Sequence, residues 1–361
     1  MTREPLVRIA KRADAAPTAA WAIRIAAIVA ALLFGGLIIL LLGHNPFAVY
    51  PVMFAGALGN SPAFRETVKI SIPLLGAAVA IAPAFKMRFW NIGAEGQIMA
   101  GAIAASYFAL YWYDKVPQPV LWLIMFLAGA LAGGLWGLIP AFFRAKWGTN
   151  ETLFTLMLNY VALQFELYMQ NGPWKDPRGT GFPKIPMFND AARLPKLLGV
   201  HIGWIIVLVF VAVMFIYLRY TKDGYEIAVV GESERTAQYA GISVTQVTLK
   251  SMAISGAVSG AVGFLVVSGA NYTLSDQSAG GVGFTAIAVA WLSKLNPIAM
   301  VAIAFFLAIL SKGSNTIQTA FEIPKSAAEV LTGIILFFML ACEFFVEYKL
   351  IFRKKSGGAA I

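Results

Sequence analysis

The feature that most constrains this chain is a succession of apolar segments, each about long enough for one helix to cross a lipid bilayer. Short polar stretches separate them and carry most of the charged residues. The segment 282–295 is shorter than the others, so it is either a half-helix or begins earlier, in the loop around Gln277. The sequence predicts an all-α, polytopic membrane protein with about ten transmembrane helices, at 22–42, 68–85, 97–113, 119–143, 152–170, 201–219, 250–268, 282–295, 297–313 and 327–347.

Composition supports this class and excludes others. Hydrophobic residues make up 59% of the 361 residues and charged residues 13%, a charged fraction about half that of a soluble domain. The net charge of +10 comes from Lys and Arg dispersed between apolar segments, so nucleic acid is not an expected partner. One cysteine, Cys342, and two isolated histidines favour neither a disulfide nor a metal site. We therefore expect no metal and no cofactor.

The distribution of basic residues orients the chain. Most of the 28 Lys and Arg residues fall in segments that are inside if the N-terminus is inside, which predicts that both termini are cytoplasmic. We expect a cytoplasmic N-terminal segment at 1–19, a transmembrane domain at 20–348 with the loop 221–250 on the cytoplasmic side, and a basic cytoplasmic tail at 349–361. No cleavable signal peptide is expected, because the first apolar run is long and lacks a cleavage site.

Two stripes of small residues predict close helix packing. Gly129, Gly133 and Gly137 recur every four residues in one predicted span, and serines at 251, 255 and 259 do so in another. Small residues at this spacing let helix backbones touch in lipid, where no hydrophobic effect drives association. We interpret these stripes as structural.

A faint internal repeat connects the two halves of the chain. The segment 147–151 precedes the fifth predicted span, and the segment 321–324 precedes the tenth. The offset is five spans, an odd number, so the two related halves would be inverted in the membrane. Inverted repeats are typical of transporters, with the pathway at the repeat interface.

A polar loop lies between the second and third predicted spans. It carries Asn91, Glu95 and Gln97, with glycines at 93 and 96. Such side chains beside a bilayer core must face protein, water or a ligand, and the glycines allow a sharp turn or a close approach. The loop is either a tight turn, cytoplasmic or re-entrant, or part of a transport pathway or its inner gate.

Polar residues also line one side of the fifth predicted span. At 100° per residue, Asn159 and Glu166 fall in one narrow arc together with Thr152, Thr155 and Gln170. A polar arc on a membrane helix either forms hydrogen bonds to neighbouring helices or lines an aqueous path, and both interpretations stay open.

The largest inner loop contains a short predicted helix from Ser233 to Gly241. Ser233 suits the N-cap, Glu234 favours the first turn, and Gly241 suits the end. A helix this short needs a docking surface, either on this chain or on another protein. The chain carries no phosphate loop, zinc-protease or serine-hydrolase motif, so no catalytic residue is predicted.

Several segments together resemble one transporter family. They are Phe89–Gln97, Thr149–Leu153 followed by Met157–Tyr160, Gly281–Ala288, and Asn296-Pro297. In order and spacing they resemble the signature of permeases of ATP-binding cassette (ABC) importers in the branched-chain amino acid, sugar and nucleoside family. The resemblance covers about 65–350, and the Asn-Ile-Gly-x-Glu-Gly-Gln and Leu-Asn-Tyr segments are closest to the nucleoside-type branch.

This resemblance implies a permease subunit that forms the translocation path for a small polar solute, most favourably a nucleoside, in two related, inverted halves. Simple sugars and branched-chain amino acids remain alternatives, as does an ATP-independent secondary transporter or channel. ATP hydrolysis would occur on a separate subunit. On their polarity and placement we assign the path or gate to Asn91, Glu95, Gln97, Asn159 and Glu166. The resemblance implies that the inner loop is the ATPase coupling loop, with Gly231, Glu232, Ser233, Glu234, Arg235 and Gly241.

The resemblance also implies partners in a bacterial cell (inner) membrane. These are cytoplasmic ABC ATPase subunits, a second permease subunit, and a periplasmic or lipid-anchored solute-binding protein, besides membrane lipids. For the second permease, a homologous heterodimer is favoured over a homodimer.

Overall fold

The computed structural model describes residues 7–11, 17–179 and 181–352. It divides into two compact units, which we describe separately. The first unit holds the described residues up to 55 and from 313 onward, and the second holds residues 56–312, so the division falls within two helices. The expected cytoplasmic segments at the two ends of the chain lie largely outside the described residues.

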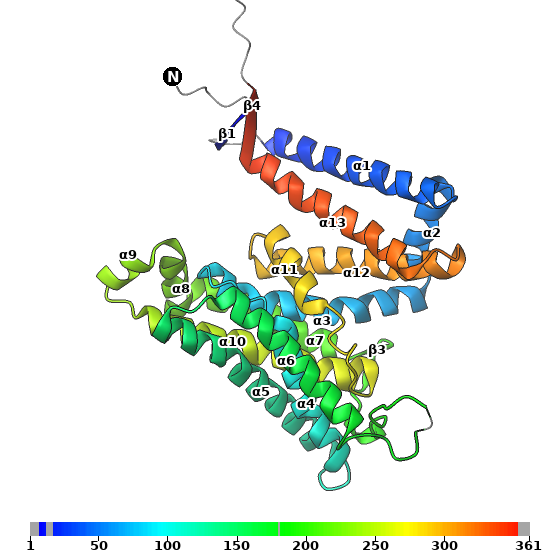
Figure 1. Cartoon of the computed structure of the whole chain (residues 1–361), viewed down its shortest axis with the longest axis vertical. Coiled ribbons are helices and arrows are strands. Elements are labelled where there is room, and N and C mark those ends of the chain that lie inside the picture. The colour runs from blue at the N-terminus through cyan, green and yellow to red at the C-terminus, as the bar shows by residue number, and fades with distance from the viewer. Residues whose placement is uncertain (1–6, 12–16, 180, 353–361) are drawn as a thin grey trace, which may run out of the picture. The chain divides into compact units, whose positions relative to one another are not determined.

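Helices dominate the structure (Figure 1), which confirms the predicted class. Each of the ten predicted spans coincides with a helix, and the segment at 282 is a short helix of 11 residues. The described helices are α1 (Pro17–Leu41), α2 (Pro46–Leu58), α3 (Ser61–Lys86), α4 (Ala94–Tyr111), α5 (Gln118–Trp147), α6 (Glu151–Asn171), α7 (Gly203–Tyr220), α8 (Lys222–Glu232), α9 (Glu234–Tyr239), α10 (Val244–Leu265), α11 (Val282–Leu292), α12 (Pro297–Ala320) and α13 (Lys325–Glu347), with a 3-10 turn η1 (Asp190–Ala192) and a π-helix η2 (Val266–Asn271).

Two helices and two small sheets were not predicted. The helix α2 has Pro46 at its first position and Pro51 inside, and a proline within a helical pattern indicates an end or a kink. The helix α8 carries charged residues in each turn, so it gives no apolar signal. Strand β1 (Val7–Lys11) pairs antiparallel with β4 (Tyr348–Phe352), and β2 (Lys196–Leu197) pairs with β3 (Val200–His201).

Six helices in the described part of the chain are long and apolar enough to cross a membrane. They are α3, α5, α7, α12, α13 and the continuous α10–η2 helix. The bent pair α1–α2, which turns by 112°, makes a seventh if it is one span; Gly43, with φ +84°, lies at the bend. The helices α4 and α6 are long enough but carry polar residues, and α11 is shorter than a bilayer span.

The first unit is built on helices from both ends of the chain. In Figure 1, α1 and α13 run side by side, and the rings of Phe34 and Phe338 lie 6.0 Å apart between them. Tyr50 on α2 donates a hydrogen bond of 2.6 Å to the Leu32 carbonyl on α1. The β1–β4 pairing, in which Val7 faces Phe352, brings the two terminal segments together.

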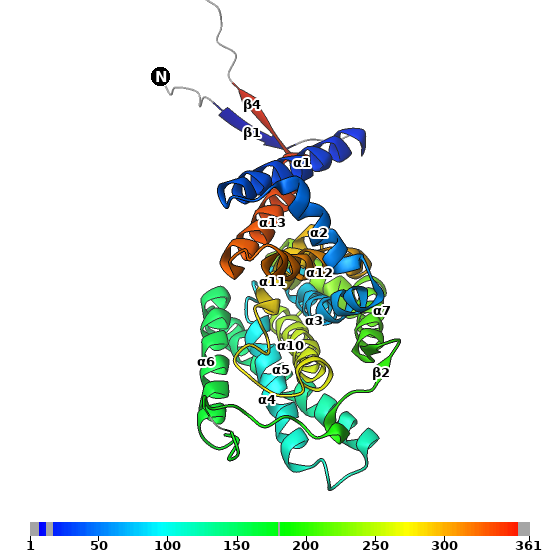
Figure 2. The same cartoon turned by 90° about the vertical axis from the view of Figure 1, so that its right-hand side faces the viewer.

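The second unit is organised around α10, which packs against α3, α4 and α5. A Cβ added to Gly101 would lie 2.2 Å from the Gly260 carbonyl oxygen, and one added to Gly133 would lie 2.3 Å from that of Gly256. These backbones are therefore in direct contact, which confirms the predicted small-residue packing. Figure 2 shows α6 at the edge of this unit, beside α4.

Candidate functional site

The predicted polar loop connects α3 to α4 and is largely buried. The side chains of Asn91 and Gln97 are almost inaccessible. The amide of Asn91 donates to Gln97 Oε1 (3.4 Å) and to Ser255 Oγ on α10 (3.2 Å), and Gln97 Nε2 donates back to Asn91 Oδ1 (3.3 Å). Asn91 Oδ1 also accepts from the backbone N–H of Gly93 (3.0 Å). These contacts fix the turn and attach it to α10.

Asn159 attaches the same loop to α6. Its side-chain amide donates to the Ile92 carbonyl (2.9 Å), and its Oδ1 accepts from the Gly96 backbone N–H (2.8 Å). Thr155, one turn earlier, accepts from the Ile92 backbone N–H (3.2 Å). A Cβ on Gly96 would lie 2.9 Å from Asn159 Oδ1 and 3.0 Å from its Cα, so this approach requires glycine.

Glu95 attaches the loop to α11. Its two carboxylate oxygens accept hydrogen bonds of 2.7 Å from the backbone N–H groups of Gly281 and Gly283. These groups belong to the first turn of α11 and the residue before it, where free N–H groups and the helix dipole favour a negative charge. Glu95 itself is in the first turn of α4. Two helix N-termini therefore meet at one half-buried carboxylate.

The structure brings four of the five predicted path residues into one network. Asn91, Glu95, Gln97 and Asn159 join the α3–α4 loop, α4, α6, α10 and α11 at a single junction, which we call the α4–α11 junction. Glu166 is not in it. That side chain is fully buried on α6, and neither carboxylate oxygen has a hydrogen-bond partner in the described part of the chain.

The polar arc of α6 thus contains two kinds of residue. Thr155, Asn159 and Gln170 form hydrogen bonds to other segments, Gln170 to the Pro183 carbonyl (2.9 Å). Of these bonds only that of Asn159 to Gly96 on α4 joins two helices, and the others join α6 to loops. Glu166 is the exception, because a buried carboxylate without a partner is unfavourable. It is the member of the arc for which water or a solute is most needed.

The predicted helix in the inner loop is present as α9. Ser233 Oγ accepts from the Thr236 backbone N–H (3.2 Å), and Gly241 has φ +76° beyond the helix end. Ala237 is the one buried residue of α9, while Glu234 and Arg235 are exposed and Tyr239 is 92% exposed. The helix therefore presents most of its surface outward.

The helix α8 supports α9 from the chain's own body. Gly231 packs so closely that an added Cβ would lie 2.1 Å from the Lys86 carbonyl oxygen at the end of α3. Glu232, the last residue of α8, is exposed. Gly231 thus has a packing role, and Glu232 lies at the surface beside α9.

Two features of this region were not predicted from the sequence. Arg144, near the end of α5, lies 3.4 Å from Glu151 on α6 and 3.9 Å from Glu234 on α9, so it connects α9 to the helix that carries Asn159. The sequence around Arg144, with Lys146 and Trp147 nearby, did not indicate that it pairs with residues of two other helices. Tyr239 is an exposed aromatic residue on a capped helix, and that combination could have been read from the sequence.

A buried histidine lies outside the helices. His201, in β3, is 3% exposed, and neither ring nitrogen has a partner among the described residues. Burial lowers the pKa of His201 to about 4, and the positive charges of Lys69 and Lys196 act in the same direction. His201 is therefore neutral at pH 7.

Comparison with known proteins agrees with the resemblance. A family model described as the permease component of branched-chain amino acid transport systems matches residues 64–340, which is most of the chain. The chain belongs to this family. The matched residues include every candidate path and coupling residue of the permease.

Its relatives are ABC transporter permeases. The permease is 32% identical to a glucose ABC transporter permease of Haloferax volcanii, over 89% of this chain and 87% of the relative. It is 32% identical to a nucleoside ABC transporter permease of Lactococcus lactis, over 90% and 91%, and 29% identical to a guanosine ABC transporter permease of Bacillus subtilis, over 92% and 96%. The chain is thus a permease subunit of an ABC importer, and not an enzyme. No solved structure matches the chain.

Proposed function

We propose that the permease imports nucleosides. Two of the relatives that match nine-tenths of the chain are named for nucleoside or guanosine transport. A polar solute of this kind cannot cross hydrocarbon unless protein supplies hydrogen-bonding groups along its route. The permease carries such groups at the α4–α11 junction and along α6.

The topology that we propose has ten spans. To the six long apolar helices and the bent α1–α2 pair it adds α4, α6 and α11. The first two are excluded by hydropathy because they carry the polar residues of the candidate site, and α11, although shorter than a bilayer span, is counted as a crossing. Both termini are then cytoplasmic, in agreement with the bias of basic residues, and the membrane is the bacterial inner membrane. The transmembrane domain is 20–348, with cytoplasmic segments at 1–19 and 349–361.

The proposed pathway runs past the α4–α11 junction. The helices α4 and α11 are five proposed spans apart, as the inverted repeat requires, and their first turns meet at Glu95. Helix N-termini that meet within the membrane at a repeat interface are a feature of transporter sites. Glu95 carries the argument, because its carboxylate joins the two repeats through charge-assisted hydrogen bonds. The α4–α11 junction is the proposed gate of the pathway. Asn91, Gln97 and Asn159 hold it in position.

Glu166 is proposed to face the path when the gate opens. It is buried without a partner among the described residues in this conformation, and an opening movement of α6 would hydrate it. The alternative is that Glu166 faces another subunit.

The proposed assembly is that of an ABC importer. The importer has two cytoplasmic ATPase subunits, and one of them docks on the coupling loop 221–250 of this chain, with the exposed α9 inserted into a groove of that ATPase. Glu234 and Arg235 flank that contact, and Gly231, Glu232, Ser233 and Gly241 shape it. A second, homologous permease completes the pathway, preferably as a heterodimer. A periplasmic or lipid-anchored solute-binding protein delivers the solute from outside, and membrane lipids surround the assembly.

The second candidate solute is a simple sugar. It is favoured by the glucose permease of Haloferax volcanii, which is as similar as the nucleoside permease. Branched-chain amino acids, the substrates in the family's description, are the third candidate.

The test is uptake by the complete importer in proteoliposomes. The binding protein would be loaded with labelled adenosine, glucose or leucine, and ATP supplied at the ATPase side. We expect ATP-dependent accumulation of adenosine and none of leucine. Accumulation of glucose without adenosine would assign the permease to sugars instead.

A further inference from the structure

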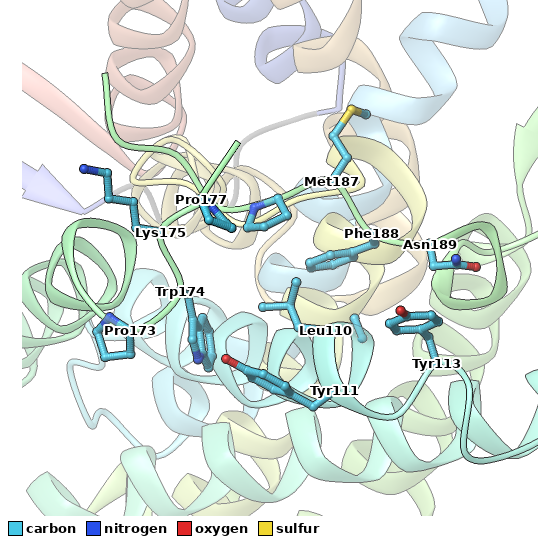
Figure 3. A pocket seen from close by; sticks show the side chains of 12 residues that line it. Leu110, Tyr111, Tyr113, Pro173, Trp174, Lys175, Pro177, Met187, Phe188 and Asn189 are labelled. Carbon is cyan, nitrogen blue, oxygen red and sulfur yellow. The ribbon is translucent and has the colours of Figure 1, made fainter. Parts of the chain in front are cut away.

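A hollow lies at the end of α4, away from the α4–α11 junction. It has a volume of about 520 Å³ and is lined by the last residues of α4 and by two stretches of the loop after α6. Figure 3 shows Trp174 beside Tyr111 at one end, Phe188 and Leu110 in the middle, and Tyr113 with Asn189 at the other end. We call this hollow the aromatic pocket.

The walls of the aromatic pocket are fixed by backbone hydrogen bonds. The Trp174 N–H donates to the Met169 carbonyl at the end of α6 (2.9 Å), and the Phe188 N–H donates to the Tyr272 carbonyl after η2 (2.8 Å). The Phe188 carbonyl accepts from Arg193 Nε and Nη2, at 3.0 and 2.8 Å. Trp174 and Phe188 are consequently buried in position, and the pocket exists before anything binds.

The aromatic pocket lies at the opposite end of α5 from the coupling loop. At one end of this 30-residue helix, Gln118 donates to the Asp190 carbonyl, next to Asn189 of the pocket. At the other end, Arg144 lies beside Glu234 on α9. The rise of 1.5 Å per residue separates these ends by about 45 Å. If α9 is cytoplasmic, the pocket faces the outside.

The lining suits a flat ring with polar edges. Tyr111 and Tyr113 are exposed, so their rings and hydroxyls are accessible to a ligand, while the buried Trp174 and Phe188 form the back wall that keeps the pocket open. Lys175 adds a cation at the margin. Aromatic side chains stack on every nucleobase, largely irrespective of base identity, and pockets of this size hold small organic ligands.

We propose that the aromatic pocket is an outer receiving site that stacks the planar base of an incoming nucleoside before it reaches the gate. This rests on the proposed nucleoside function. The site selects for the base rather than for the ribose, which stays in water. Its affinity is low, because a receiving site must release the solute onward.

Direct binding is the sharpest test. Saturation-transfer NMR would be recorded on the assembled importer in lipid nanodiscs without the binding protein, with adenosine as the probe and ribose as the comparison. We expect saturation of the base protons above that of the ribose protons and none for free ribose. Trp174→Leu should raise the dissociation constant of adenosine, obtained by titrating the base signal, about tenfold because it removes the back wall of the pocket, and Trp174→Phe should retain most of the affinity.

Two further variants keep the result decisive. Tyr111→Leu changes an exposed wall residue and should also reduce the signal if Trp174→Leu fails to fold. Phe182→Leu is the matched control, since Phe182 is 95% exposed in the same loop but does not line the pocket. An unchanged adenosine signal in both pocket variants would overturn the proposal.

Uptake separates this proposal from the proposed function and from protein docking. If wild-type importer does not take up adenosine, the nucleoside function is wrong. If wild type does but Trp174→Leu has unaltered uptake and binding, the receiving site alone is wrong. If Trp174→Leu weakens binding of the solute-free binding protein to the importer, the pocket is a protein-docking surface and the proposal is overturned.

Discussion

The carboxylate of Glu95 and the backbone of Gly283 are in direct contact, although they are 188 residues apart in sequence. The Gly283 N–H donates to Glu95 Oε2 (2.7 Å), and an added Cβ on Gly283 would lie 2.4 Å from the Glu95 backbone nitrogen. The contact therefore depends on a charge on one side and on the absence of a side chain on the other. The charge of Glu95 and the missing side chain of Gly283 can be tested by separate substitutions.

Glu95→Gln should keep the size of the side chain and weaken the junction, because one of the two accepting oxygens becomes an NH2 donor that faces a backbone N–H. Hydrogen bonds to a charged group are worth about 1.5–3 kcal/mol against about 1 kcal/mol for neutral ones, so uptake should fall about tenfold while the protein still assembles. Uptake and size-exclusion profiles would measure this. If Glu95→Gln and Asn91→Ala both take up solute as fast as wild type, the loop is a structural turn with no role in the gate.

Gly283→Ala should destabilise the junction more than Glu95→Gln does. The new methyl group would meet backbone atoms rather than a flexible side chain, and overpacking of this kind costs about 1–3 kcal/mol. Gly333→Ala on α13 is the matched control, since, apart from the nearby backbone of its own helix, no atom of the described residues lies within 4 Å of the place that its methyl group would take. Thermal unfolding in detergent would compare the two, and equal midpoints would refute the steric argument.

Asn159→Ala should be as harmful as a core mutation. It leaves the Gly96 N–H and the Ile92 carbonyl unpaired in a buried site, at about 1–3 kcal/mol each. Gln164→Ala, on the exposed side of α6, should leave the unfolding midpoint unchanged.

A cysteine at 166, with Cys342 replaced by serine, should resist a water-soluble thiol reagent at rest and react during turnover. Protection during turnover would assign Glu166 to packing.

The double variant Glu234→Ala and Arg235→Ala should uncouple ATP hydrolysis from uptake. Both residues lie on the exposed α9, and Glu234 also contacts Arg144, so insertion into the membrane should be unaffected. Lys222→Ala is the control, because Lys222 pairs with Glu226 on α8, in the same loop but outside α9. Normal uptake with normal substrate-stimulated ATPase activity in the double variant would exclude α9 as the coupling helix.

His201 should make the permease less stable in acid. Its pKa is about 4 in the folded chain and about 6.5 when unfolded, so protonation favours the unfolded state. The stability contribution is fully present above pH 6.5 and is lost as the pH falls through 4, by about 3 kcal/mol at most. Unfolding midpoints from pH 8 to 4 should fall less steeply for His201→Gln than for wild type. Parallel profiles would show that His201 does not titrate on unfolding.

Much of the fold could be predicted because hydropathy is a local signal. Every predicted span is a helix, and Ser233 and Gly241 marked the ends of α9 through capping chemistry. The helix α2 was missed because Pro46 and Pro51 resemble a connection. The β1–β4 pairing was missed because it joins residues more than 330 positions apart, and no local pattern encodes a partner at that distance.

The candidate site was predictable in identity but not in geometry. Unusual polar residues in apolar surroundings singled out Asn91, Glu95 and Asn159, yet their partners could not be read. The partner groups are largely backbone N–H and carbonyl groups, at Gly281, Gly283, Gly96 and Ile92. Every residue has these groups, so the sequence contains no mark of which ones are used.

The pairing of β1 with β4 determines the parity of the membrane crossings. Strands that share one ladder lie on the same side of a bilayer, so a chain whose first and last strands pair must cross an even number of times. In the proposed topology the bent α1–α2 pair is one crossing, and together with the six long apolar helices it makes seven. An odd number of the remaining candidates must then cross as well, and α4, α6 and α11 together satisfy this. Fluorescent reporters fused to the two ends should accordingly report the same compartment.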